Sequence, residues 1–112
     1  MATLQLNSRL QSRLGITQEQ LAEFCQRWKV TELALFGSVL RDDFSANSDV
    51  DILVSFTPHH SWGLEFMQMR EELAVLVKRP VDLLTRQSIM NSHNLLRRQA
   101  ILDSAEVIYA AR

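Results

Sequence analysis

The sequence predicts a small domain of the α/β or α+β class, in which a mixed β-sheet is flanked by helices. Short apolar runs typical of strands occur at residues 31–36, 49–56, 80–84 and 105–109. Stretches with helical spacing of apolar residues lie before, between and after the first three runs. This alternation indicates a sheet covered by helices, but it does not fix the order of the strands.

Residues 1–15 are polar with scattered leucines and end at Gly15, so we expect a short helix or a loose N-terminal arm. Thr17 is a good helix N-cap, and Gln20 completes a capping box with it. The next turns place apolar residues on one helix face, at Leu21, Phe24, Cys25 and Trp28. Cys25 is therefore predicted to be a buried core thiol rather than a nucleophile.

The first predicted strand, 31–36, runs directly into Gly37-Ser38. Glycine lets the backbone approach a ligand closely, and the N–H groups that begin a helix favour phosphate, with the Ser38 hydroxyl as a further donor. Arg41 follows one turn later in a polar stretch, where we expect one or two helical turns and then a turn at 45–48. These residues form a candidate phosphate site.

The second predicted strand opens with Asp49 and Asp51. Side chains alternate along a strand, so carboxylates two residues apart point the same way. The pair is a candidate cation site, and magnesium suits it because this ion takes few protein carboxylates and completes its shell with water and phosphate oxygens. Aspartate also occurs in turns before strands, but that does not explain Asp51 inside one apolar run and Asp82 inside another, where unpaired charge is costly.

Residues 57–61 are predicted to form a loop that includes His59 and His60. No cysteine or histidine cluster has zinc spacing, so we interpret this stretch as a loop or a contact segment. A helix is expected over 62–78, ending at Lys78-Arg79 before a proline. Its predicted apolar face consists of Phe66, Met69, Leu73, Leu76 and Val77.

Asp82 lies in the short apolar run after that proline. Thr85 or Ser88 is the expected cap of a following helical region, and Asn91 or Ser92 the expected cap of a further helix through residue 102. Strand-forming residues then end the chain.

The combination Gly37-Ser38, Arg41, Asp43 and Ser48-Asp49-x-Asp51 resembles the active-site signature of the DNA polymerase beta-type nucleotidyltransferases. The short chain is similar to their minimal nucleotidyltransferase (MNT) members. This resemblance implies the nucleotidyltransferase palm fold and a third carboxylate on a neighbouring strand, which Asp82 supplies.

The resemblance also implies roles for these residues. Asp49, Asp51 and Asp82 would be the catalytic carboxylates and would bind two magnesium ions. The nucleotide-binding residues would be Gly37, Ser38, Arg41 and Ser48, with ATP as the donor substrate and Asp43 in a supporting role.

Composition narrows the possible functions. The 112 residues allow one domain, 1–112, and the formal net charge of -1 argues against sequence-independent binding to long nucleic acids. A single cysteine and the lack of a membrane-spanning apolar run predict a cytoplasmic protein.

The acceptor is predicted from the resemblance alone. Many MNT proteins pair with a HEPN ribonuclease toxin and inactivate it by transferring AMP to a tyrosine, so an antitoxin of this kind is the leading hypothesis. Two alternatives stay open: an antitoxin that masks its HEPN partner by binding, and a nucleotidyltransferase that modifies a small molecule such as an antibiotic. Exposed leucine and methionine positions in the arm 1–15 and in the helix 62–78 are the candidate partner surface.

Overall fold

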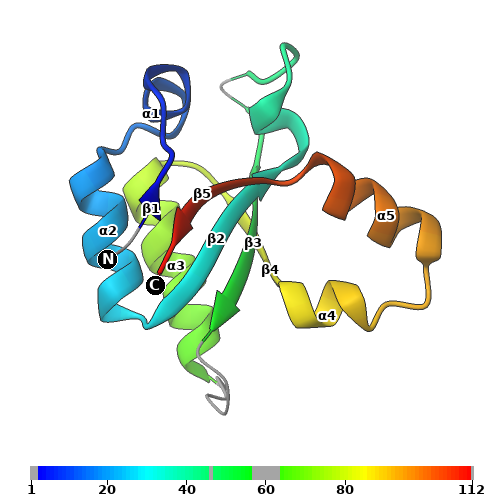
Figure 1. Cartoon of the computed structure of the whole chain (residues 1–112). Helices are drawn as coiled ribbons and strands as arrows, with labels where there is room; N and C mark the ends of the chain where they lie inside the picture. Colours follow the sequence, from blue (N-terminus) through cyan, green and yellow to red (C-terminus); the bar gives the residue numbers. More distant parts are fainter. Residues whose placement is uncertain (1–2, 46, 57–63, 112) are drawn as a thin grey trace.

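A computed structural model describes residues 3–45, 47–56 and 64–111 and contains one five-stranded sheet (Figure 1). The strand order is β1-β5-β2-β3-β4. Only β3 and β4 are parallel, and the other neighbours pair antiparallel. The mixed sheet predicted from sequence is therefore confirmed. The strands are β1 (Thr3–Leu4), β2 (Val30–Phe36), β3 (Val50–Phe56), β4 (Val81–Thr85) and β5 (Glu106–Ala110).

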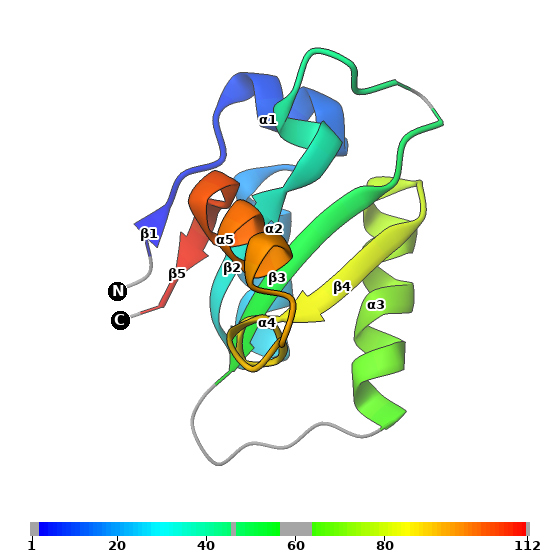
Figure 2. The ribbon, with the colours of Figure 1, turned by 90° about the vertical axis from the view of Figure 1, so that its right-hand side faces the viewer.

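Helices lie on both faces of the sheet. Figure 2 shows α4 and α5 in front of the sheet, with α2 and α3 behind it. The predictions made for His59, His60 and the start of the helix at Trp62 fall outside the described residues. The helices are α1 (Ser8–Leu14), α2 (Gln18–Arg27), α3 (Leu64–Val77), α4 (Arg86–Met90) and α5 (Leu95–Ser104), with a short 3-10 helix, η1 (Gly37–Leu40).

The larger core fills the space between the sheet and α1, α2 and α3. The predicted helix faces supply its side chains, because Phe24 of α2 and Met69 of α3 are fully buried there. Alternate residues of the strands complete it, among them Leu35 of β2 and Ile52 of β3. Cys25 belongs to this core, as predicted.

A smaller core lies on the opposite face of the sheet, under α4 and α5. Ile89 of α4 and Ile101 of α5 pack there against Ala34, Phe36 and Leu53. These strand residues alternate with those of the larger core, so the strands β2 and β3 contribute apolar side chains to both faces.

Helix starts follow the sequence signals in two cases and depart from them in one. Thr17 and Gln20 form the predicted capping box, with N···O distances of 2.9 and 3.1 Å. Thr85 caps α4 through the N–H of Ser88. The prediction of Asn91 or Ser92 as the next cap is wrong, because the side chain of Asn94 accepts the N–H of Arg97 at 3.0 Å.

Residues 3–15 are an integral part of the fold rather than a loose arm, and they include the predicted short helix. α1 is capped by Asn7 and ends at Gly15, which has a left-handed backbone. Leu6, Leu10 and Leu14 are buried in the larger core. The prediction that leucines of this arm form a partner surface is therefore wrong.

The helix before Pro80 ends one residue before its predicted end. α3 stops at Val77, and Lys78 adopts a left-handed backbone with a φ of 58°. Among the described residues, no helix combines the length and the apolar composition that crossing a membrane requires.

Candidate active site

Two of the predicted carboxylates face each other across neighbouring strands. In the parallel pairing of β3 with β4, Asp51 lies opposite Asp82. The flanking residues of both strands point into the larger core, so by alternation both aspartates project from the face that carries α4 and α5. Asp49 directly precedes β3, two residues before Asp51. The sheet thus places Asp51 and Asp82 together at one end of one face, and Asp49 is close enough for its charge to act on Asp51.

The electrostatics of Asp51 reflect this convergence. Its pKa is raised above the ordinary value, first by burial and then by the negative charges of Asp82 and Asp49, while Arg41 and Arg97 oppose the shift. Like charges held together disfavour ionisation unless a cation joins them. A divalent cation bound here would relieve the repulsion between the three carboxylates.

Gly37 lies directly beside Asp51. Phe36, the last residue of β2, is the strand partner of Asp51, and Gly37 continues from it with a φ of 78°. A Cβ atom on Gly37 would lie 2.1 Å from Oδ2 of Asp51. This position therefore requires glycine for its backbone and for the space that the carboxylate occupies.

Arg13 of α1 holds the beginning of the loop that joins η1 to β3. Its guanidinium donates hydrogen bonds to the carbonyls of Val39, at 2.8 Å, and Arg41. It also lies 5.4 Å from the ring centroid of Phe44. Helix α1 is thereby attached to the segment that carries Arg41.

Arg79 holds the end of the same loop. It follows α3 and donates to the carbonyls of Ser45, at 2.8 Å, and Ser48, at 3.2 Å. Its guanidinium lies 4.5 Å from the centroid of Phe44, so the ring contacts two arginines. Because Ser48 precedes Asp49, Arg79 fixes the backbone from which the first carboxylate projects. Sequence reasoning missed both arginines, although a lone aromatic residue in a polar loop was a possible signal.

The remaining predicted site residues lie in η1 and along this loop. Nε of Arg41 donates to Asp43 at 3.2 Å, and both side chains are exposed. The hydroxyl of Ser48 accepts the N–H of Ser45 at 3.0 Å, so it stabilises the predicted turn. Ser38 is half-buried in η1, next to Gly37.

The donors suit a hard cation such as magnesium. Oxygen ligands are those that Mg²⁺ prefers, and it commonly uses only one or two carboxylates together with water and substrate phosphates. Across the described ranges, no three His, Cys, Asp or Glu groups are placed to hold one ion together. A site that is completed by a nucleotide does not require such a cluster. Cys25 is buried in the larger core, on the other face of the sheet from Asp51 and Asp82, and burial raises the pKa of its thiol to about 12.

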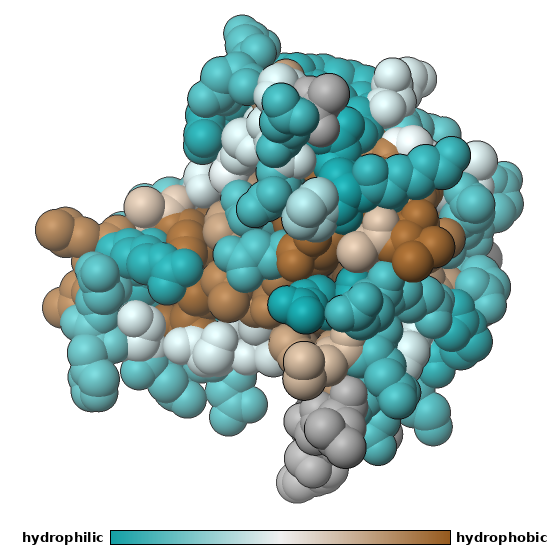
Figure 3. Space-filling view, turned by 180° about the vertical axis from the view of Figure 1, so that it is seen from behind, coloured by the Kyte–Doolittle hydropathy of each residue, from teal (hydrophilic) through white to brown (hydrophobic). Residues whose placement is uncertain are grey.

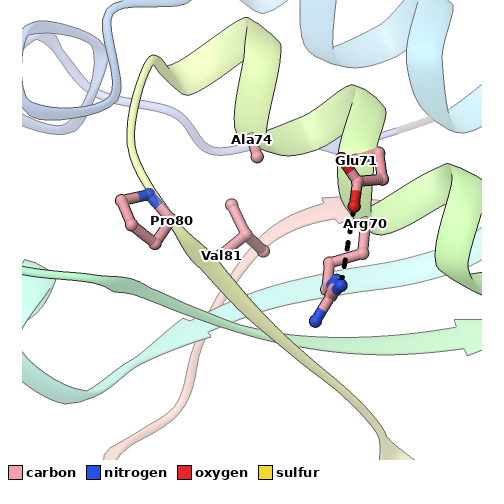
Figure 4. A pocket seen from close by; sticks show the side chains of 5 residues that line it. All are labelled: Arg70, Glu71, Ala74, Pro80 and Val81. Carbon is pink, nitrogen blue, oxygen red and sulfur yellow. Dashed lines mark ion pairs between the residues drawn. The ribbon is translucent and has the colours of Figure 1, made fainter.

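A pocket of about 260 Å³ lies between α3 and β4 (Figure 4). Its lining includes Val81, which belongs to the larger core, and the ion pair between Arg70 and Glu71 at 3.6 Å. None of the predicted site residues lines it. The pocket is therefore separate from the carboxylates, although Asp82 follows Val81 directly.

Comparisons with known proteins agree with this geometry. A family model described as a nucleotidyltransferase domain matches residues 18–108. The protein adenylyltransferase MntA of Thermococcus cleftensis is 37% identical over 89 residues, which cover 80% of this chain and 85% of that protein.

Solved structures share the fold. A toxin-antitoxin structure with AMP-PNP matches with a TM-score of 0.65 and 18% identity, over 87% of this chain and 76% of the other. A structure of the toxin-antitoxin pair MntA-HepT matches with a TM-score of 0.56 and 18% identity, over 83% and 69% of the two chains.

Proposed function

The chain belongs to the nucleotidyltransferase domain family, and from this premise we propose that it is a magnesium-dependent antitoxin that transfers AMP from ATP to a tyrosine of a cognate HEPN ribonuclease toxin. The observation that carries this proposal is the pairing of Asp51 with Asp82, two residues from Asp49, on one face of the sheet. The name and similarity of the adenylyltransferase relative support the choice of AMP and of a protein acceptor. The proposal includes a cytoplasmic location, where ATP is available.

Asp49 and Asp51 would hold two magnesium ions, and Asp82 would share one of them. When bound, the ions would supply charge neutralisation for the triphosphate and would lower the pKa of the acceptor hydroxyl. The three carboxylates fit this role because they are concentrated at one end of the sheet and repel one another without a cation.

The transfer forms a bond between the tyrosine oxygen and the α-phosphorus of ATP and breaks the bond from that phosphorus to the oxygen that leaves with pyrophosphate. Asp82 would accept the hydroxyl proton. Gly37 and Ser38 would hold the β- and γ-phosphates, and Arg41 would balance charge on the leaving pyrophosphate. Ser48 and Asp43 would act by ordering the loop, as their hydrogen bonds indicate.

The test is the intact mass of a cognate HEPN protein after incubation with the native chain, MgCl2 and ATP. We expect mass to increase in whole AMP units with the native chain, and no increase with the Asp49→Asn, Asp51→Asn double variant. The Glu19→Gln, Glu23→Gln variant is a matched control because it removes two exposed carboxylates from α2, in the opposite helical layer.

Two results would overturn the proposal. If neither chain adds AMP and both still bind and inhibit the HEPN protein, inhibition by masking is the better account. If the native chain adds AMP to an aminoglycoside but not to the HEPN protein, the small-molecule hypothesis replaces it.

A further inference from the structure

The described surface exposes few large apolar side chains, and most of them lie at the junction of α4 and α5. Met90, Leu95 and Leu96 are 51%, 61% and 86% exposed. We call these three residues the α4–α5 patch. Arg98 joins the two helices by donating to the carbonyl of Met90 at 3.0 Å. Seen from behind, apolar residues form the outermost part of the side formed by these two helices (Figure 3).

The α4–α5 patch belongs to the helical layer on the catalytic face. Ile89 and Ile101 anchor α4 and α5 on Phe36 and Leu53, and Asp51 and Asp82 project from the same face. The other exposed large apolar residues, Met67 and Val75, are on α3, which packs on the opposite face. A protein that presents a hydroxyl to the aspartates must approach from the side of α4 and α5.

The region around the α4–α5 patch has an excess of positive charge. From the start of α4 to the end of α5, residues 86–104 contain three arginines, one histidine and one acidic residue, Asp103 in the last turn of α5, although the whole chain has a formal net charge of -1. Arg86 is paired with Glu32 at 2.6 Å. Arg97 is exposed and close enough to Asp51 for its charge to act on that carboxyl group. Arg97 thus lies near the aspartates and Arg98 lies at the junction of the two helices, and the charges of both favour an acidic partner surface.

We propose that the α4–α5 patch, together with Arg97 and Arg98, is the docking site for the protein acceptor of adenylyl transfer. The acceptor would cover the patch with an apolar surface bordered by carboxylates. This inference rests on the proposed function, since it assigns the surface that brings the acceptor hydroxyl to the site.

The test compares two pairs of exposed apolar residues. Leu95→Gln with Leu96→Gln removes the centre of the patch, and Met67→Gln with Val75→Gln is the matched control on α3. Glutamine keeps helix propensity high. The rate of AMP transfer is measured against the concentration of the HEPN protein, and the affinities for that protein and for AMP-PNP with magnesium are measured by calorimetry.

We expect the Leu95, Leu96 variant to raise the KM and the Kd for the HEPN protein about 10- to 100-fold, with unchanged affinity for AMP-PNP. The control variant should behave as the native chain does. Raising the salt concentration should weaken acceptor binding to the native chain, because charge attraction between exposed groups is screened.

Each other result has a definite meaning. Normal transfer and normal affinity in the Leu95, Leu96 variant would overturn the docking site and leave the proposed function intact. If only the α3 variant loses affinity for the HEPN protein, the docking site is on α3. If the native chain associates with itself and only the Leu95, Leu96 variant loses this self-association, the patch binds a second copy of this chain. Binding without transfer by the native chain, if lost in the Leu95, Leu96 variant, would support the docking site and reject adenylyl transfer. Neither binding nor transfer would reject both for this HEPN protein.

Discussion

The two faces of the sheet differ in what they carry: one has most of the buried core, and the other has the predicted catalytic aspartates. The face covered by α1, α2 and α3 has the larger core, in which Leu35, Phe24 and Met69 are fully buried. The face under α4 and α5 has a smaller core and carries Asp51 and Asp82. A sheet that is held firmly from one side leaves the other side free to expose charged groups. The following substitutions test this division.

The largest expected difference in stability is between Leu35→Ala and Leu53→Ala. Both side chains are buried, in the larger and the smaller core respectively. We expect Leu35→Ala to lower the free energy of unfolding by about 4 kcal/mol and Leu53→Ala by about 2 kcal/mol, because the smaller core under α4 and α5 is better able to collapse into the cavity. Urea unfolding measures both. Equal losses of unfolding free energy in the two variants would contradict this difference between the two cores.

The next comparison separates backbone strain from damage to the site. Gly15 and Gly37 both have positive φ, of 70° and 78°, but only at Gly37 would a Cβ meet another group. We expect each alanine substitution to cost about 1 kcal/mol of stability. Gly37→Ala should also lower the rate of AMP transfer about 100-fold, because it displaces the Asp51 carboxylate. A normal rate in Gly37→Ala would show that AMP transfer does not depend on the exact position of the Asp51 carboxylate.

Arg79 links the end of α3 to the loop between η1 and β3. Arg79→Ala removes its hydrogen bonds to Ser45 and Ser48 and its contact with Phe44. We expect kcat for AMP transfer to fall about 10-fold, with a stability loss of only about 1 kcal/mol. Arg79→Lys should restore part of the rate, and the exposed Arg70→Ala is the control. A rise in KM for ATP with unchanged kcat would argue against positioning of the loop.

The smallest expected effect concerns the link between α2 and α3. Hydrogen bonds from Arg27 and Trp28 lower the pKa of Glu72. A lowered folded-state pKa stabilises the protein above the unfolded-state value of about 4.5 and loses this effect as the pH falls through the folded-state pKa.

We therefore expect Glu72→Gln to cost at most about 1 kcal/mol at pH 7, since the pair is partly exposed. The difference from the native chain should vanish in acid. Thermal unfolding between pH 3 and pH 7 measures it. A difference that is constant over this range would assign the effect to packing rather than charge.

Local signals in the sequence were sufficient for much of the fold and for the carboxylates. The capping box of Thr17 and the alternation around Asp51 depend on residues within a few positions, which is why they are readable without a structure. The resemblance implied only that Asp82 lies on a neighbouring strand. The register that places it opposite Asp51 was not predicted, because pairing partners are not encoded in either strand alone.

Features that depend on distant residues were missed. Arg13 reaches Val39 and Arg79 reaches Ser45 across 26 and 34 positions, and nothing in their neighbourhood indicates these bonds. The exposure of Leu95 and Leu96 was also not predicted, because leucines at helical spacing resemble core residues. Four successive polar residues, 91–94, made the choice of the α5 cap ambiguous.

The register of β3 against β4 determines whether a folded chain brings its carboxylates together. A slip of one residue would turn Asp82 toward α3 and put an aliphatic side chain beside Asp51. The bond from the N–H of Val50 to the carbonyl of Pro80, at 3.0 Å, fixes the first step of the correct pairing. The specific activity of a preparation would then report the fraction of chains with the correct strand register, because only those chains bring the carboxylates together.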